Sequence, residues 1–174
     1  MSEERNAYEK SITNTELAKV GFKLPKLLYE ALQIRMKAEG YVDGIGNYYF
    51  YLTSYEFYQQ YKEIFYRVKE GIAPIANSMQ LSELPNFNIS NEAAWEIMKG
   101  KMTDSPVMIY QLPITHLQVC QHLAECLHYH KSASILYRFF TIKILIAKLQ
   151  HELAILRSDS EPAPTSINQQ TLFD

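Results

Sequence analysis

Four histidines and two cysteines, all side chains that can ligate a transition metal, fall within fifteen consecutive residues of the chain. They are His116, Cys120, His122, Cys126, His128 and His130. Because His122, Cys126 and His130 are spaced by four, they would share one helix face and could bind zinc or a similar ion. The spacing is not a paired zinc motif such as Cys-x-x-Cys, and cysteines pack well beside the leucines of this segment. We therefore expect no metal or other cofactor here, and histidines that lie on a wet or interfacial face.

A second group of polar side chains lies on one face of a predicted strand. Residues 17–24 alternate, with one face made of Val20, Phe22 and Leu24 and the other of Lys19, Gly21 and Lys23. A period of two predicts a short strand with one buried face. A helix should follow Pro25 and stop at Gly40. A second helix, rich in aromatic residues, should run from Tyr48 to Glu70 after an N-cap at Asn47.

This order of a strand and two helices resembles the ribbon-helix-helix family of DNA-binding proteins over about a third of the chain. The resemblance implies a homodimer, in which two chains pair their strands into a ribbon that enters the major groove of duplex DNA. It implies that Lys19, Gly21 and Lys23 face the bases. It also implies that Gly46 and Asn47, before the second helix, contact phosphate through backbone N–H groups.

A second resemblance lies in the last residues of the chain. The sequence Gln169-Gln-Thr-Leu-Phe173 is similar to the short peptide by which bacterial replication and repair proteins bind the sliding clamp. Gln169, Leu172 and Phe173 match the usual pattern, Thr171 is close to its preferred serine, and Gln170 replaces its usual leucine. Leu172 and Phe173 would fill an apolar pocket, which is where such contacts gain most of their energy. The preceding Pro- and Ser-rich segment predicts a disordered linker that presents the peptide.

The whole pattern predicts a mainly α-helical protein. Beyond residue 74 we expect loop to residue 89, a short helix over 91–101, a strand over 106–112, and helices from Thr115 to His130 and from Ser132 or Ser134 to Arg157. The predicted organisation is a flexible N-terminus (1–16), a ribbon-helix-helix-like segment (17–74), a helical domain (75–157) and a disordered tail with its binding peptide (158–174).

Composition limits the compartment and the class of partner. The formal net charge is only −2, which argues against a generally basic nucleic-acid binder but leaves room for a local basic patch. The polar start predicts no secretory signal, and four charges within Ile135–Leu156 argue against a membrane span. Cys120 and Cys126 would lie about 9 Å apart along a helix, too far to bridge. We therefore expect a reducing, cytoplasmic location.

The sequence contains no glycine-rich phosphate loop and no nucleophile elbow, so we do not expect an enzyme. The first hypothesis is a DNA-associated adaptor that binds duplex DNA as a dimer and is tethered to the sliding clamp by its tail. The alternative is a protein-only helical subunit of a larger assembly with no direct DNA contact. Near-neutral charge favours the alternative, whereas the strand pattern and the tail favour the first hypothesis.

Overall fold

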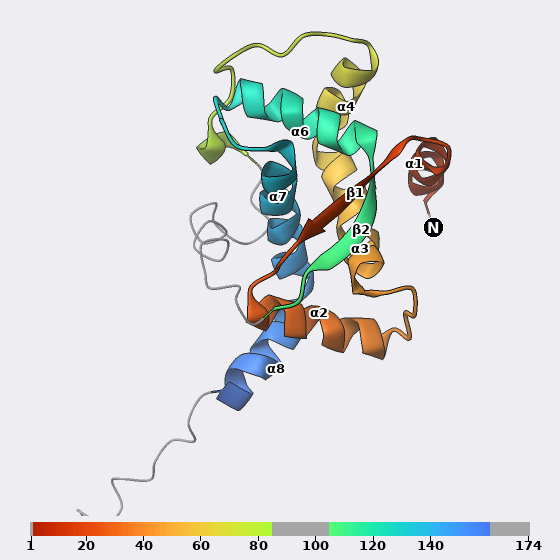
Figure 1. Ribbon diagram of the computed structural model, residues 1–174, viewed down its shortest axis with the longest axis vertical. Coiled ribbons are helices and arrows are strands. Elements are labelled where there is room, and N and C mark those ends of the chain that lie inside the picture. The colour runs from red at the N-terminus through yellow and green to blue at the C-terminus, as the bar shows by residue number, and fades with distance from the viewer. Residues whose placement is uncertain (1, 85–104, 161–174) are drawn as a thin grey trace, which may run out of the picture.

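The computed structural model describes residues 2–84 and 105–160, which form a mainly helical protein with a small two-stranded sheet (Figure 1). In chain order the elements are α1 (Glu3–Thr13), β1 (Leu17–Phe22), α2 (Lys26–Ala38), α3 (Ile45–Gln60), α4 (Lys62–Lys69), the 3-10 turn η1 (Leu81–Glu83), β2 (Met108–Pro113), α6 (Ile114–Cys126), α7 (Ala133–Lys148) and α8 (Gln150–Ser160). The predicted mainly α-helical class is confirmed.

Helix α7 forms the centre of the core. Its residues from Leu136 to Ile146, apart from Arg138, are buried. Helices α3 and α6 pack against it, α4 packs on α6, and α2 packs on α8. Figure 1 shows α6 crossing one end of this group while α2 and α8 lie at the other end.

The sheet joins segments that are far apart in the sequence. Strands β1 and β2 are antiparallel, with Leu17 opposite Pro113 and Phe22 opposite Met108. The inner face is buried on both strands, and Val20 and Phe22 point inward as predicted. The resemblance had implied that β1 finds its partner only in a second chain. The structure differs, because the strand predicted over 106–112 supplies that partner within the same chain.

This pairing also crosses the predicted domain boundary at residue 74. One continuous set of buried apolar residues includes Val20 and Leu32 from the first predicted segment and Tyr110 and Leu145 from the second. The described residues therefore share a single hydrophobic core, in contrast to the two predicted segments.

Two predicted long helices are each broken in two. The first ends at Gln60 and resumes at Lys62, and the last is interrupted at Leu149. Tyr61 and Leu149 are both buried in the core. Because neither residue is glycine or proline, packing rather than a local helix breaker positions the two breaks.

The N-terminal segment also differs from the flexible start that was predicted for residues 1–16. Ser2 caps α1 by accepting a hydrogen bond from the Arg5 backbone N–H at 3.2 Å. Tyr8 is buried beside α3 and α6. One buried aromatic residue thus anchors a helix that is mostly polar.

None of the described helices is long and apolar enough to cross a membrane. The helix predicted over 91–101 and the tail peptide with Gln169, Thr171, Leu172 and Phe173 lie outside the described residues.

Candidate functional sites

The outward face of the β1–β2 sheet carries the residues that were predicted to meet DNA. Lys19 and Gly21 are exposed on β1, as predicted for that face, and Lys23 is half-buried just beyond the strand. Opposite them lie Gln111 and Ile109, which pair with Lys19 and Gly21. No described element covers this face in Figure 1.

Three apolar side chains share this surface with the lysines. Leu17, Val107 and Ile109 are each about half exposed. A Cβ added at Gly21 would lie 3.4 Å from the Val107 Cγ1 and 3.6 Å from the Ile109 Cγ1. These are ordinary contact distances, so Val107 and Ile109 lie directly beside Gly21 and the ribbon has a mixed basic and apolar face.

The turn before α3 does not have the predicted geometry. The helix begins at Ile45 after Gly44, whose φ of 93° suits glycine, so Asn47 lies within the first turn and is not the N-cap. The Asn47 side-chain amide donates to the Asp43 carbonyl at 2.9 Å. Gly46 is buried, and a Cβ at this position would lie 2.2 Å from the Ile109 carbonyl oxygen. Gly46 therefore allows close packing of α3 on β2 and is not exposed to a phosphate.

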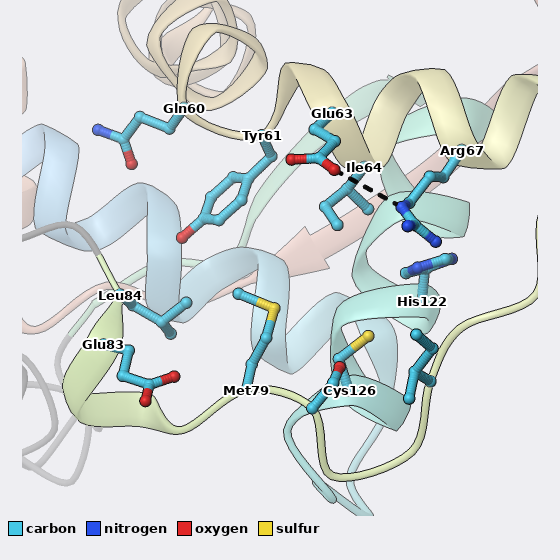
Figure 2. Close-up of a pocket in the computed structure, with 12 residues that line it drawn as sticks. Gln60, Tyr61, Glu63, Ile64, Arg67, Met79, Glu83, Leu84, His122 and Cys126 are labelled. Carbon is cyan, nitrogen blue, oxygen red and sulfur yellow. Dashed lines mark ion pairs between the residues drawn. The ribbon is translucent and has the colours of Figure 1, made fainter.

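A cavity of about 310 Å³ opens between α4 and α6, and we call it the α4–α6 cavity (Figure 2). It is lined by Gln60, Tyr61, Glu63, Ile64, Arg67, Ile75, Ser78, Met79, Glu83, Leu84, His122 and Cys126. The sequence indicated only His122 and Cys126 as candidates, because they are one helical turn apart.

The irregular segment before η1, which contains Asn77 and Met79, forms a third wall of the cavity, and backbone hydrogen bonds hold it in place. The Met79 N–H donates to the Cys126 carbonyl at 3.0 Å, and the Asn77 N–H donates to the Glu125 carbonyl at 3.3 Å. Asn77 has a positive φ of 59°, a conformation that asparagine tolerates better than most residues. The irregular segment before η1 is thereby fixed against the end of α6.

The charged residues that line the cavity are Glu63, Arg67 and Glu83. Glu63 and Arg67 form an ion pair at 3.8 Å on α4, drawn as a dashed line in Figure 2. Burial lowers the pKa of His122, and the positive charge of Arg67 lowers it further, whereas Glu125 opposes the shift. The His122 ring is therefore neutral at neutral pH, and a neutral imidazole can act as a ligand or hydrogen-bond acceptor.

The other histidines and Cys120 lie elsewhere. His116 is fully buried, and its Nε2 lies 2.9 Å from the Tyr8 hydroxyl. Cys120 is fully buried, and burial raises its pKa. Helix α6 ends at Cys126, so His130 lies beyond the helix, with its Nε2 3.1 Å from that of His128. The predicted shared face of His122, Cys126 and His130 is therefore wrong at His130.

The described residues contain no group of three or more His, Cys, Asp and Glu side chains that could hold a metal ion. Met79 and Arg67 line the same cavity as His122 and Cys126, and the sequence did not indicate them. Neither residue could have been assigned to this site from local spacing, because each comes from a segment that only the fold brings to α6.

Comparisons of the chain with protein-family models, curated proteins and solved structures find no match.

Proposed function

We propose that this protein is a non-enzymatic adaptor that attaches to a bacterial sliding clamp through its C-terminal peptide. The observation that carries the proposal is the sequence Gln169-Gln-Thr-Leu-Phe173 after a Pro- and Ser-rich linker. Leu172 and Phe173 supply the apolar anchors, Gln169 supplies a hydrogen-bonding group at the pocket rim, and Thr171 stands where the motif prefers serine. Anchors of this kind provide most of the binding energy of a small interface.

The position of α8 supports this role. Its end at Ser160 lies at the edge of the described structure, away from α4 and α6 (Figure 1). Residues 161–168 could span roughly 26–29 Å if fully extended. A peptide on a linker of this length can reach a partner without displacing the helical core.

Isothermal titration calorimetry with a purified bacterial clamp tests the proposal. We expect the whole protein to bind and the Leu172→Ala, Phe173→Ala double variant to lose binding at unchanged thermal stability. A Thr165→Ala, Ser166→Ala variant is the matched control, because it changes two linker residues outside the motif and should bind like the parent. Equal heats from the parent and the Leu172→Ala, Phe173→Ala variant would remove the clamp proposal.

For the helical core we propose duplex DNA binding through the β1–β2 ribbon. The supporting observation is the exposed face with Lys19 and Gly21, next to Lys23, on a two-stranded antiparallel ribbon. Such a ribbon has the width that the major groove admits. Since one chain makes both strands, a single protomer would suffice, and the homodimer is a separate proposal.

The homodimer proposal rests on the other edge of β1. The Glu16 carbonyl accepts from the Ile114 N–H at 2.9 Å, so by antiparallel alternation the backbone groups of Leu17, Lys19 and Gly21 point away from β2. No other described strand pairs with β1, so a second copy could add its own β1 there.

The alternative is that the core binds only protein. Leu17, Val107 and Ile109 favour it, because an exposed apolar group beside polar residues is typical of a protein-binding surface. A gel shift at rising salt separates the two, because binding through phosphate contacts weakens steeply with salt.

A further inference from the structure

We propose that the α4–α6 cavity is a binding site for Cu(I), with Met79, His122 and Cys126 as its ligands. This site is independent of the clamp peptide and of the ribbon face. It adds a metal ion to a protein whose sequence alone predicts none.

The fold places the three donors on the walls of one cavity. His122 and Cys126 are one turn apart on α6, and the Met79 backbone N–H bonds to the Cys126 carbonyl at 3.0 Å. Figure 2 shows the sulfur atoms of Met79 and Cys126 both directed into the cavity from two neighbouring segments of the chain. The His122 ring lies on the same face of α6, beside Arg67.

The donor types select the ion. A thiolate and a thioether are soft ligands that prefer Cu(I), and imidazole also binds copper well. Zinc sites usually have four ligands from Cys, His and carboxylates, whereas the described residues contain no group of three such side chains arranged so that they could hold a metal ion. Two sulfur atoms and one nitrogen atom instead match a three-coordinate, monovalent soft ion.

The charge balance is also favourable. On binding, Cu(I) replaces the proton of the Cys126 thiol, which passes to solvent, so the copper–thiolate unit carries no net charge. Glu63, paired with Arg67 at 3.8 Å, offsets the positive charge of Arg67 beside His122.

Burial protects the proposed site. Cys126 is 3% exposed and His122 is 6% exposed, which limits access of water and oxidants to the thiolate. The cavity volume of about 310 Å³ leaves room for an ion between the walls. Met79 lies in an irregular segment, so its long side chain can adjust to the metal at small cost.

Anaerobic titration with Cu(I) against a chromophoric Cu(I) chelator tests the proposal. We expect the whole chain to withdraw one Cu(I) per molecule from the chelator. Cys126→Ala should abolish this binding. Met79→Leu and His122→Gln should each weaken Cu(I) binding by at least ~10–100-fold, because loss of even an outer-shell group that supports a metal ligand has an effect of this size.

The chain offers its own matched control. Cys120→Ala removes the other free thiol, which is buried outside the cavity, and should leave Cu(I) binding unchanged. X-ray absorption of the copper-loaded parent, which needs no variant to fold, should show two sulfur neighbours and one nitrogen neighbour. The proposal is overturned if the parent binds no more Cu(I) than Cys126→Ala, if Cys120→Ala loses as much, or if copper has only nitrogen and oxygen neighbours.

Discussion

The Tyr8 hydroxyl and the His116 Nε2 lie 2.9 Å apart and join α1 to α6 across 108 residues of sequence. Both side chains are buried. The His116 ring lies among aromatic rings, including that of Phe65 at 5.1 Å and that of Phe57 at 6.0 Å between centroids. Stability should be sensitive to the loss of either member of a polar pair inside an aromatic cluster, because the remaining group would be buried without a hydrogen-bond partner.

Tyr8→Phe tests how strongly this pair holds α1. The ring stays but the hydroxyl is lost, so the His116 Nε2 is left buried without its partner. We expect a loss of about 1–2 kcal/mol in the free energy of unfolding, measured by urea denaturation. Tyr66→Phe is the control, because Tyr66 is 60% exposed and its change should leave stability within about 0.5 kcal/mol of the parent.

His116 should also make stability depend on pH. Burial lowers its pKa from 6.5 to about 3, so the unfolded chain takes up a proton on acidification well before the folded chain does. Stability is therefore fully present above about pH 6.5 and falls between about pH 6.5 and pH 3, by up to roughly 1.4 kcal/mol per pH unit. Below about pH 3 both states are protonated and this loss ends.

A His116→Gln variant isolates the contribution of the histidine. Glutamine keeps a polar partner for Tyr8 but does not titrate, so the variant should lose less stability than the parent between pH 6.5 and 4. The comparison is needed because the pKa of Glu152 is also lowered. Burial, the largest single effect, raises that pKa, but the hydrogen bond from Arg35, a backbone hydrogen bond and the positive charges of Arg35 and His151 together outweigh it. Glu152 therefore also causes stability to fall with acidification. Identical pH profiles for parent and variant would contradict the assigned role of His116.

The elements that the sequence predicted well are those whose signal is local. Alternation in residues 17–24 correctly gave the inward direction of Val20 and Phe22. The pairing of β1 with β2 could not be read in this way, because it joins Leu17 to Pro113 through the packing of the whole core. Helix α1 was not predicted, because its residues are mostly polar and Tyr8 provides its main contact with the core.

The same division applies to the cavity. The spacing of four between His122 and Cys126 correctly placed them on one helix face. His130 was wrongly added because the sequence gives no clear helix end at Cys126, where His128 takes a positive φ of 52°. Met79 could not be predicted, since a backbone hydrogen bond from an irregular segment brings it to this place.

Gly46→Ala separates the structural role of this glycine from the phosphate contact that the family resemblance implied. Alanine favours a helix over glycine by about 1 kcal/mol, but its Cβ would lie 2.2 Å from the Ile109 carbonyl oxygen. We expect the steric clash to outweigh the gain in helix propensity, so that the free energy of unfolding falls by about 1–3 kcal/mol. Gly21→Ala is the control, since its Cβ would meet its neighbours at 3.4 Å or more. Equal stability of the two variants would contradict the close packing of α3 on β2.

The last prediction concerns the ribbon and duplex DNA. Lys19→Ala with Lys23→Ala removes the two positive charges next to Gly21 on or beside the outward face of β1. If the ribbon enters the major groove, this variant should bind duplex DNA more weakly than the parent in a gel shift. The slope of log affinity against log salt should also become shallower, by about one for each phosphate that the variant no longer neutralises.

Lys37→Ala with Lys69→Ala is the matched control for this prediction. It removes the same charge from exposed positions on α2 and α4, so it tests whether net charge alone explains the effect. Light scattering on the same samples measures whether the binding species is a protomer or the proposed dimer. If the ribbon variant binds as well as the control, the ribbon does not face the groove. The exposed apolar group of Leu17, Val107 and Ile109 then favours a protein partner for the helical core.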